Sequence, residues 1–79
     1  MSNRQKYDNC FIEAFELESE VALDKLAYQS IEEWDSIGHM SLMAELEEAF
    51  DIEIKTEDLI QFESYVQGSE ILKRYSVEV

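Results

Sequence analysis

Residues 34–54 read WDSIGHMSLMAELEEAFDIEI, and this stretch carries most of the information about the fold. Between Ser36 and Phe50 its apolar residues recur at spacings of three and four, which predicts a helix with an apolar face. Asp35 or Ser36 is expected to cap the start of that helix, because a short polar side chain accepts a hydrogen bond from a free backbone N–H group. The face turned to the core is expected to contain Leu42, Met43, Leu46, Ala49 and Phe50.

The segment before this helix divides into a helix and a long loop. A helix is expected over about residues 3–17, with Ser2 or Asn3 as its cap and an apolar stripe of Tyr7, Cys10, Phe11, Ala14 and Phe15. Residues 18–34 lose the helical period, which predicts a loop of unusual length for a compact domain. Apolar side chains are expected to anchor the loop to the core, namely Val21, Leu23, Leu26, Ile31 and Trp34.

Two more helices are expected after residue 54, and only the first of them is short. The first covers about residues 57–61, and Thr56 is expected to cap it. The second covers about residues 65–75, where Ser64 followed three residues later by Gln67 is a capping-box signature. Strand patterns do not exceed a few residues. The chain is therefore predicted to form an all-α, small four-helix bundle in a single domain over residues 1–79.

Composition and charge limit the function classes. A chain of 79 residues with 46% apolar content is globular, but its core is too thin for a deep catalytic cleft. Nineteen acidic against six basic residues give a net charge of −13, which disfavours nucleic acid and membrane as partners and favours basic proteins. The alternative is that acidity only confers solubility. With no transmembrane stretch, no signal peptide and one Cys, the protein is expected to be cytoplasmic and monomeric.

The stretch from Asp35 to Ile54 resembles the acyl carrier protein family. In that family an Asp-Ser-Leu motif opens the second helix, and Asp35-Ser36-Ile37 matches it. The helix usually closes with a Leu-Glu-Glu-x-Phe-Asp-x-Glu-Ile run, which residues 46–54 match closely. The order of helices and the long acidic loop extend the resemblance to the whole chain. A start at Met1 and the lack of linker-like stretches favour a freestanding carrier over an excised domain.

The resemblance implies that Ser36 carries a covalent 4′-phosphopantetheine arm, which a phosphopantetheinyl transferase takes from coenzyme A. The arm would hold an acyl or aminoacyl group as a thioester for partner enzymes with basic docking patches, so the chain itself would not be an enzyme. Those acyl-loading and acyl-transferring partners would read the second helix and its surroundings through Asp35, Ile37, Met40, Ala44, Glu47, Glu48 and Glu53. The interior would be formed by Phe11, Phe15, Leu42, Leu46, Phe50, Ile54, Leu59, Phe62, Ile71 and Leu72.

Several positions depart from the pattern of fatty-acid carriers. Gly38 and Ser41 stand where an Asp and a Glu are frequent, while His39 and Lys55 replace a common Thr and Pro. Gly38 is expected to cost up to about 1 kcal/mol near the helix start. These differences favour a specialised carrier over the housekeeping fatty-acid carrier. Such a carrier would serve partner enzymes of fatty-acid, polyketide-like or surface-polysaccharide pathways, or would be loaded with amino acids.

The same residues are open to other functions. An unmodified acidic interaction module would leave Ser36 as a plain N-cap. A small hydrolase would need His39 as the base for Ser36, but His39 is expected to touch a partner or face solvent. Metal binding is not expected, because residues 51–58 lack the central Gly of a calcium loop and a single His and Cys cannot form a zinc site. Cys10 is expected to be a buried apolar residue.

Overall fold

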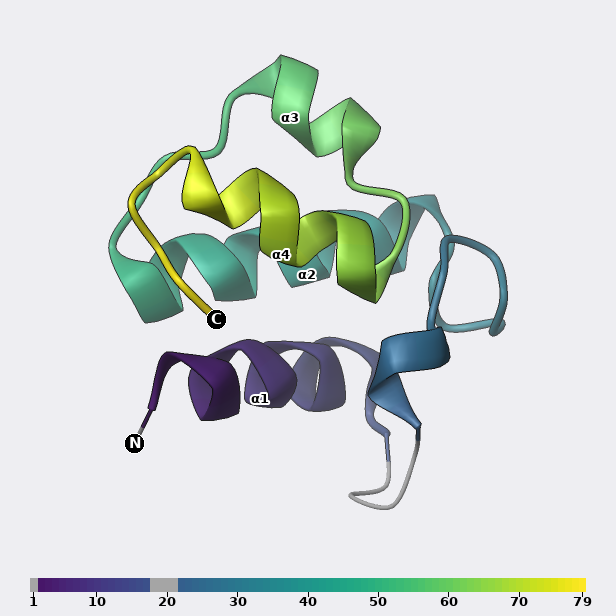
Figure 1. Ribbon diagram of the computed structural model, residues 1–79. Coiled ribbons are helices and arrows are strands. Elements are labelled where there is room, and N and C mark those ends of the chain that lie inside the picture. The colour runs from purple at the N-terminus through teal and green to yellow at the C-terminus, as the bar shows by residue number, and fades with distance from the viewer. Residues whose placement is uncertain (1, 18–21) are drawn as a thin grey trace.

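The computed structural model describes residues 2–17 and 22–79 of the chain (Figure 1). They contain the helices α1 (Asn3–Phe15), α2 (Ser36–Phe50), α3 (Thr56–Gln61) and α4 (Tyr65–Lys73), with a 3-10 turn η1 (Leu23–Lys25) between α1 and α2. Within these ranges the only β pairing is an isolated bridge between Ala27 and Ser64. The prediction of a small all-α bundle with four helices is confirmed.

The ends of α1 and α2 are set by side-chain caps and left-handed residues. At the start of α1, Ser2 Oγ accepts from Gln5 N (3.2 Å) while Gln5 Oε1 accepts from Ser2 N (3.0 Å), which completes a capping box. Both helices end on a left-handed residue, Glu16 with φ 53° and Asp51 with φ 52°. The expected end of the first helix at residue 17 was therefore two residues too late.

Helices α3 and α4 each differ from expectation at one end. Thr56 is the first residue of α3 and does not cap it; the N-cap is Lys55, which makes no side-chain capping bond. The predicted Thr56 cap is therefore wrong. Ser64 does cap α4, accepting from Gln67 N at 3.0 Å. That helix ends at Lys73 rather than at residue 75, with Arg74 as its C-cap.

The three longer helices lie roughly along one direction, and the chain reverses between α1 and α2 (Figure 1). In the view of Figure 1, short α3 lies above α2 and α4, and α1 lies below them. An aromatic cluster fills the centre, where Phe11 stacks edge-on against Tyr7 and Trp34 at ring distances of 5.0 and 5.6 Å. Phe62 and Tyr65 close this cluster from the α3–α4 side.

Most residues of the predicted interior are buried, but the prediction left out several others that are also buried. Eight of the ten expected residues are buried, while Phe50 and Leu59 pack against the core from a partly exposed position. Other buried side chains complete the core, namely Tyr7, Cys10, Leu26, Trp34, Met43, Tyr65 and Val77. The core is therefore richer in aromatic side chains than the interior expected from the resemblance.

The loop between α1 and α2 is anchored to the rest of the protein, as predicted. Leu26 and Trp34 are buried, and Leu23 and Ile31 pack against the core. Its backbone also pairs with the α3–α4 connection: Tyr28 N donates to Glu63 O (2.7 Å), and Leu26 O accepts from Tyr65 N (3.0 Å). The remaining expected anchor, Val21, lies outside the described residues. These contacts place Tyr28 beside the start of α2.

Candidate functional site

Ser36 is exposed at the amino end of α2, a helix of 15 residues. Asp35 caps this helix, since its Oδ1 accepts from Gly38 N at 2.8 Å. Ser36 is therefore the first helical residue, and the alternative that it is the N-cap is wrong. The Ser36 hydroxyl makes no capping bond. It lies at a point where free backbone N–H groups and the helix dipole favour an anion.

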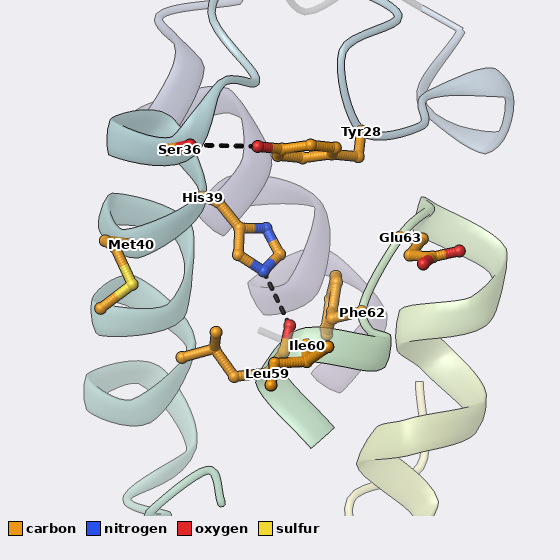
Figure 2. A pocket seen from close by; sticks show the side chains of 8 residues that line it. All are labelled: Tyr28, Ser36, His39, Met40, Leu59, Ile60, Phe62 and Glu63. Atoms are coloured by element: carbon orange, nitrogen blue, oxygen red, sulfur yellow. Dashed lines mark hydrogen bonds between the residues drawn. The ribbon is translucent and has the colours of Figure 1, made fainter. Parts of the chain in front are cut away.

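A surface groove of about 370 Å³ borders Ser36 (Figure 2). Its walls come from the loop, α2, α3 and the residues after α3, and it is lined by Tyr28, Ser36, His39, Met40, Leu59, Ile60, Phe62 and Glu63. The Tyr28 hydroxyl lies 3.2 Å from Ser36 Oγ, and either oxygen can be the donor. The groove is mainly apolar and ends at the Ser36 hydroxyl. Sequence reasoning missed Tyr28, because only the fold of the long loop brings it to Ser36.

His39 is buried, with 9% of its surface exposed, so the expectation that it faces solvent or a partner is wrong. The Trp34 indole Nε1–H donates to His39 Nδ1 at 2.9 Å. His39 Nε2 lies 2.8 Å from the carbonyl oxygen of Leu59, across the gap between α2 and α3 (Figure 2). The imidazole therefore ties the loop, α2 and α3 together.

The two partners of His39 fix its tautomer. An indole N–H can only donate and a carbonyl oxygen can only accept, so Nδ1 carries the lone pair and Nε2 carries the proton. Both nitrogens are thus engaged within the fold. This arrangement leaves no nitrogen of His39 to take a proton from Ser36, as the hydrolase alternative would require.

Gly38 has a packing role that its helix propensity does not indicate. A Cβ atom at this position would lie 1.9 Å from the carbonyl oxygen of Glu33 and 3.2 Å from the Phe15 ring. Glycine thus lets the loop pass close to the first turn of α2. The expected penalty for glycine at this site is wrong in sign, because a larger residue would meet the backbone.

The predicted docking residues lie on an accessible surface along α2 and just beyond it. Asp35, Ile37, Met40, Ala44, Glu48 and Glu53 are all exposed. Ile37 and Met40 stand out because 79% and 56% of their surfaces reach solvent, although both are apolar. Glu47 is half-buried, and its Oε2 accepts from Ile54 N at 2.9 Å. Part of the Glu47 carboxylate therefore holds the α2–α3 connection.

Cys10 and Asp58 are engaged in the fold and are not part of the groove. Cys10 is buried, and this burial raises the pKa of its thiol to about 12, so the thiol is not ionised near neutral pH. Asp58 accepts from the Tyr75 hydroxyl and from Arg74 Nη1, and these bonds hold the pKa of its carboxyl below the ordinary value. Within residues 2–17 and 22–79, His, Cys, Asp and Glu side chains form no group of three suited to a metal ion.

Comparisons with protein-family models, with characterised proteins and with solved structures find no match to this chain. None of the helices in the described ranges is long and apolar enough to cross a membrane. Function is therefore inferred from the geometry around Ser36.

Proposed function

We propose that this chain is a specialised acyl carrier protein, with Ser36 Oγ as the attachment point of 4′-phosphopantetheine. The observation that carries the proposal is that capping and presentation of a hydroxyl fall to two different residues at the start of α2. Asp35 makes the capping bond, and Ser36 presents an exposed hydroxyl at the positive end of the helix dipole. A serine needed only for capping would occupy the Asp35 position.

The surroundings of Ser36 fit a phosphodiester. The Tyr28 hydroxyl lies within hydrogen-bond distance of Oγ and can donate to a phosphate oxygen beside it. A transferase would bind coenzyme A, and Ser36 Oγ would attack its phosphorus while adenosine 3′,5′-bisphosphate leaves and the transferase takes the serine proton. When bound, the arm supplies a thiol that holds the acyl group as a thioester. The chain itself positions the arm and presents it to partner enzymes.

Docking of those partners is proposed on the α2 surface. Exposed Ile37 and Met40 offer apolar contacts, and Glu48 and Glu53 offer charges for basic patches. Charge reversal in Glu48→Lys is expected to weaken binding to the loading transferase on the order of tenfold, as measured by titration calorimetry. Glu13→Lys on α1 is the matched control, since it changes the net charge by the same amount on another surface. Equal weakening of binding by both variants would mean that α2 is not the docking surface.

A second candidate is an interaction module that docks basic partners without any arm. The same exposed Ile37 and Met40 favour it, because large exposed apolar residues among acids are typical of contact surfaces. This module would bind partners through α2 but would have no use for a free hydroxyl at Ser36.

Intact mass spectrometry separates the two candidates. The protein is incubated with coenzyme A and a broad-specificity phosphopantetheinyl transferase, beside Ser36→Ala and a matched Ser41→Ala variant. Ser41 is also exposed on α2 and lies five residues further along. The carrier proposal expects one added arm on the wild type and on Ser41→Ala, and none on Ser36→Ala. Failure of transferases from several pathways to load the wild type would leave the interaction module.

A further inference from the structure

The groove beside Ser36 has a closed floor. The His39 ring spans from Trp34 to the Leu59 carbonyl, with both nitrogens bonded at 2.9 and 2.8 Å. Phe62, which is 1% exposed, lines the groove beside His39, whereas Trp34, which is 0% exposed, bonds to the imidazole without lining the groove. The imidazole thus separates the groove from the Trp34 indole. It lines the groove together with Phe62 (Figure 2). An apolar chain entering beside Ser36 meets His39 before it reaches the interior.

The walls of the groove are apolar and exposed. Met40 on α2 and Ile60 on α3 expose 56% and 67% of their surfaces, and Tyr28 exposes 36%. Its volume of about 370 Å³ is near the lower limit for small-molecule sites. A short hydrocarbon chain bound here would shield both these side chains and its own surface from water. This burial is favourable in proportion to the apolar area covered.

We propose that this groove holds the cargo of the carrier, and that His39 restricts it to a short apolar acyl chain. The inference rests on the proposed function, because the arm on Ser36 returns its cargo to the groove that borders its own attachment point. His39 is then the size-determining residue, although it touches no reacting atom. A longer chain must displace the imidazole, which breaks its bonds to Trp34 and Leu59 and leaves the buried indole N–H without a partner. That loss offsets the gain from burying the next few methylenes.

The test measures melting temperature against acyl chain length. A series of acyl-coenzyme A thioesters, from acetyl to dodecanoyl, is used to load wild-type protein, and intact mass confirms each product. Every melting temperature is compared with that of the same variant carrying the arm without an acyl group. Relative to that reference, each half-covered methylene is expected to raise the melting temperature on the order of 2 °C. In the wild type the rise is expected to stop after the first few carbons.

Three variants locate the effect. His39→Ala opens the floor and is expected to extend the rise to longer chains. Ile60→Trp fills the groove from its exposed wall and is expected to abolish the rise, without a change in the core. Val66→Trp is the matched control, because Val66 is 57% exposed but lies outside this groove. It should leave the wild-type profile unchanged.

Each outcome decides between the proposals. A wild-type rise that continues to dodecanoyl, as in His39→Ala, would show that His39 does not limit the cargo. A flat profile in every loaded variant would show that the groove does not hold cargo. Either result overturns this inference and leaves the carrier function intact, since loading is read separately by mass. Failure to load any thioester would overturn both proposals together.

Discussion

His39 joins three segments that are distant along the chain, and its loss should weaken all three. In His39→Leu the ring is replaced by an apolar group, so the buried Trp34 Nε1–H loses its acceptor. The Leu59 carbonyl still accepts from Phe62 N, although at 3.4 Å. We expect His39→Leu to lower the free energy of unfolding by about 1–3 kcal/mol, mainly from the unpaired indole. Urea denaturation followed by circular dichroism measures this change.

A matched variant separates the lost bond from the changed shape at this position. His39→Asn keeps an acceptor near Nδ1, so it should recover part of the stability that His39→Leu loses. If the leucine variant were as stable as the wild type, the Trp34–His39 bond would carry no weight in the fold.

Gly38 gives a prediction opposite to helix propensity. Alanine is the better helix former by about 1 kcal/mol, so propensity alone expects Gly38→Ala to stabilise α2. The Cβ atom would instead lie 1.9 Å from the Glu33 carbonyl oxygen, and the loop backbone must shift to admit it. We expect a net loss of about 1–2 kcal/mol in urea denaturation. Ser41→Ala, at an exposed position of the same helix, should be within about 0.5 kcal/mol of the wild type.

These two residues show where reasoning from the sequence stops. The period of apolar residues located α2 and its buried face correctly, because that signal is local. The roles of His39 and Gly38 depend on Leu59, twenty residues away, and on the path of an aperiodic loop. Trp34 was expected to anchor that loop, but nothing in the spacing indicated that its indole N–H required an acceptor on α2.

Helix α3 has only six residues and needs support from its neighbours, because so short a helix is not stable alone. Asp58 supplies this support by accepting from Arg74 and Tyr75 beyond the end of α4. The Tyr75 hydroxyl in turn accepts from Lys55 N at 2.9 Å, at the start of α3. The start of α3 was predicted within one residue. The contacts that stabilise α3 were not predicted from the sequence, since they join residues sixteen or more positions apart.

Asp58→Asn should reveal this support through pH. Hydrogen bonds from Tyr75 and Arg74 lower the pKa of Asp58 below its ordinary value of 3.8 in the folded state. The group therefore stabilises the fold above about pH 4, and this contribution disappears as pH falls through the lowered pKa. We expect Asp58→Asn to be less stable than the wild type at pH 7, with the difference shrinking below pH 4. Urea titrations at pH 7, 5, 4 and 3 measure it, and a difference that does not change with pH would contradict the assignment.

The molecule as a whole combines a small aromatic core with a strongly acidic surface. The chain carries a net charge of −13, and its principal extents are only 28 × 27 × 18 Å for the part that the structure describes. At 10 mM salt the Debye length is about 30 Å, so every carboxylate senses the others across the whole molecule. At 150 mM it is about 8 Å, and only near neighbours still repel. Because the repulsion acts against the compact state, salt should stabilise the fold.

The same charge should make folding and docking respond to salt in opposite directions. Between 10 and 150 mM NaCl we expect the melting temperature to rise by several degrees, on the order of 1 kcal/mol in stability. Over that range, association with the loading transferase should slow, because screening removes the attraction between the acidic surface and a basic patch.

A triple variant, Glu13→Gln, Glu45→Gln and Asp51→Asn, neutralises exposed acids outside the predicted docking residues. It should show a smaller thermal gain and keep most of the salt dependence of association, since the α2 charges that face the partner are unchanged. A melting temperature that does not respond to salt in the wild type would mean that local ion pairs already balance the repulsion, and that the surface charge serves binding alone.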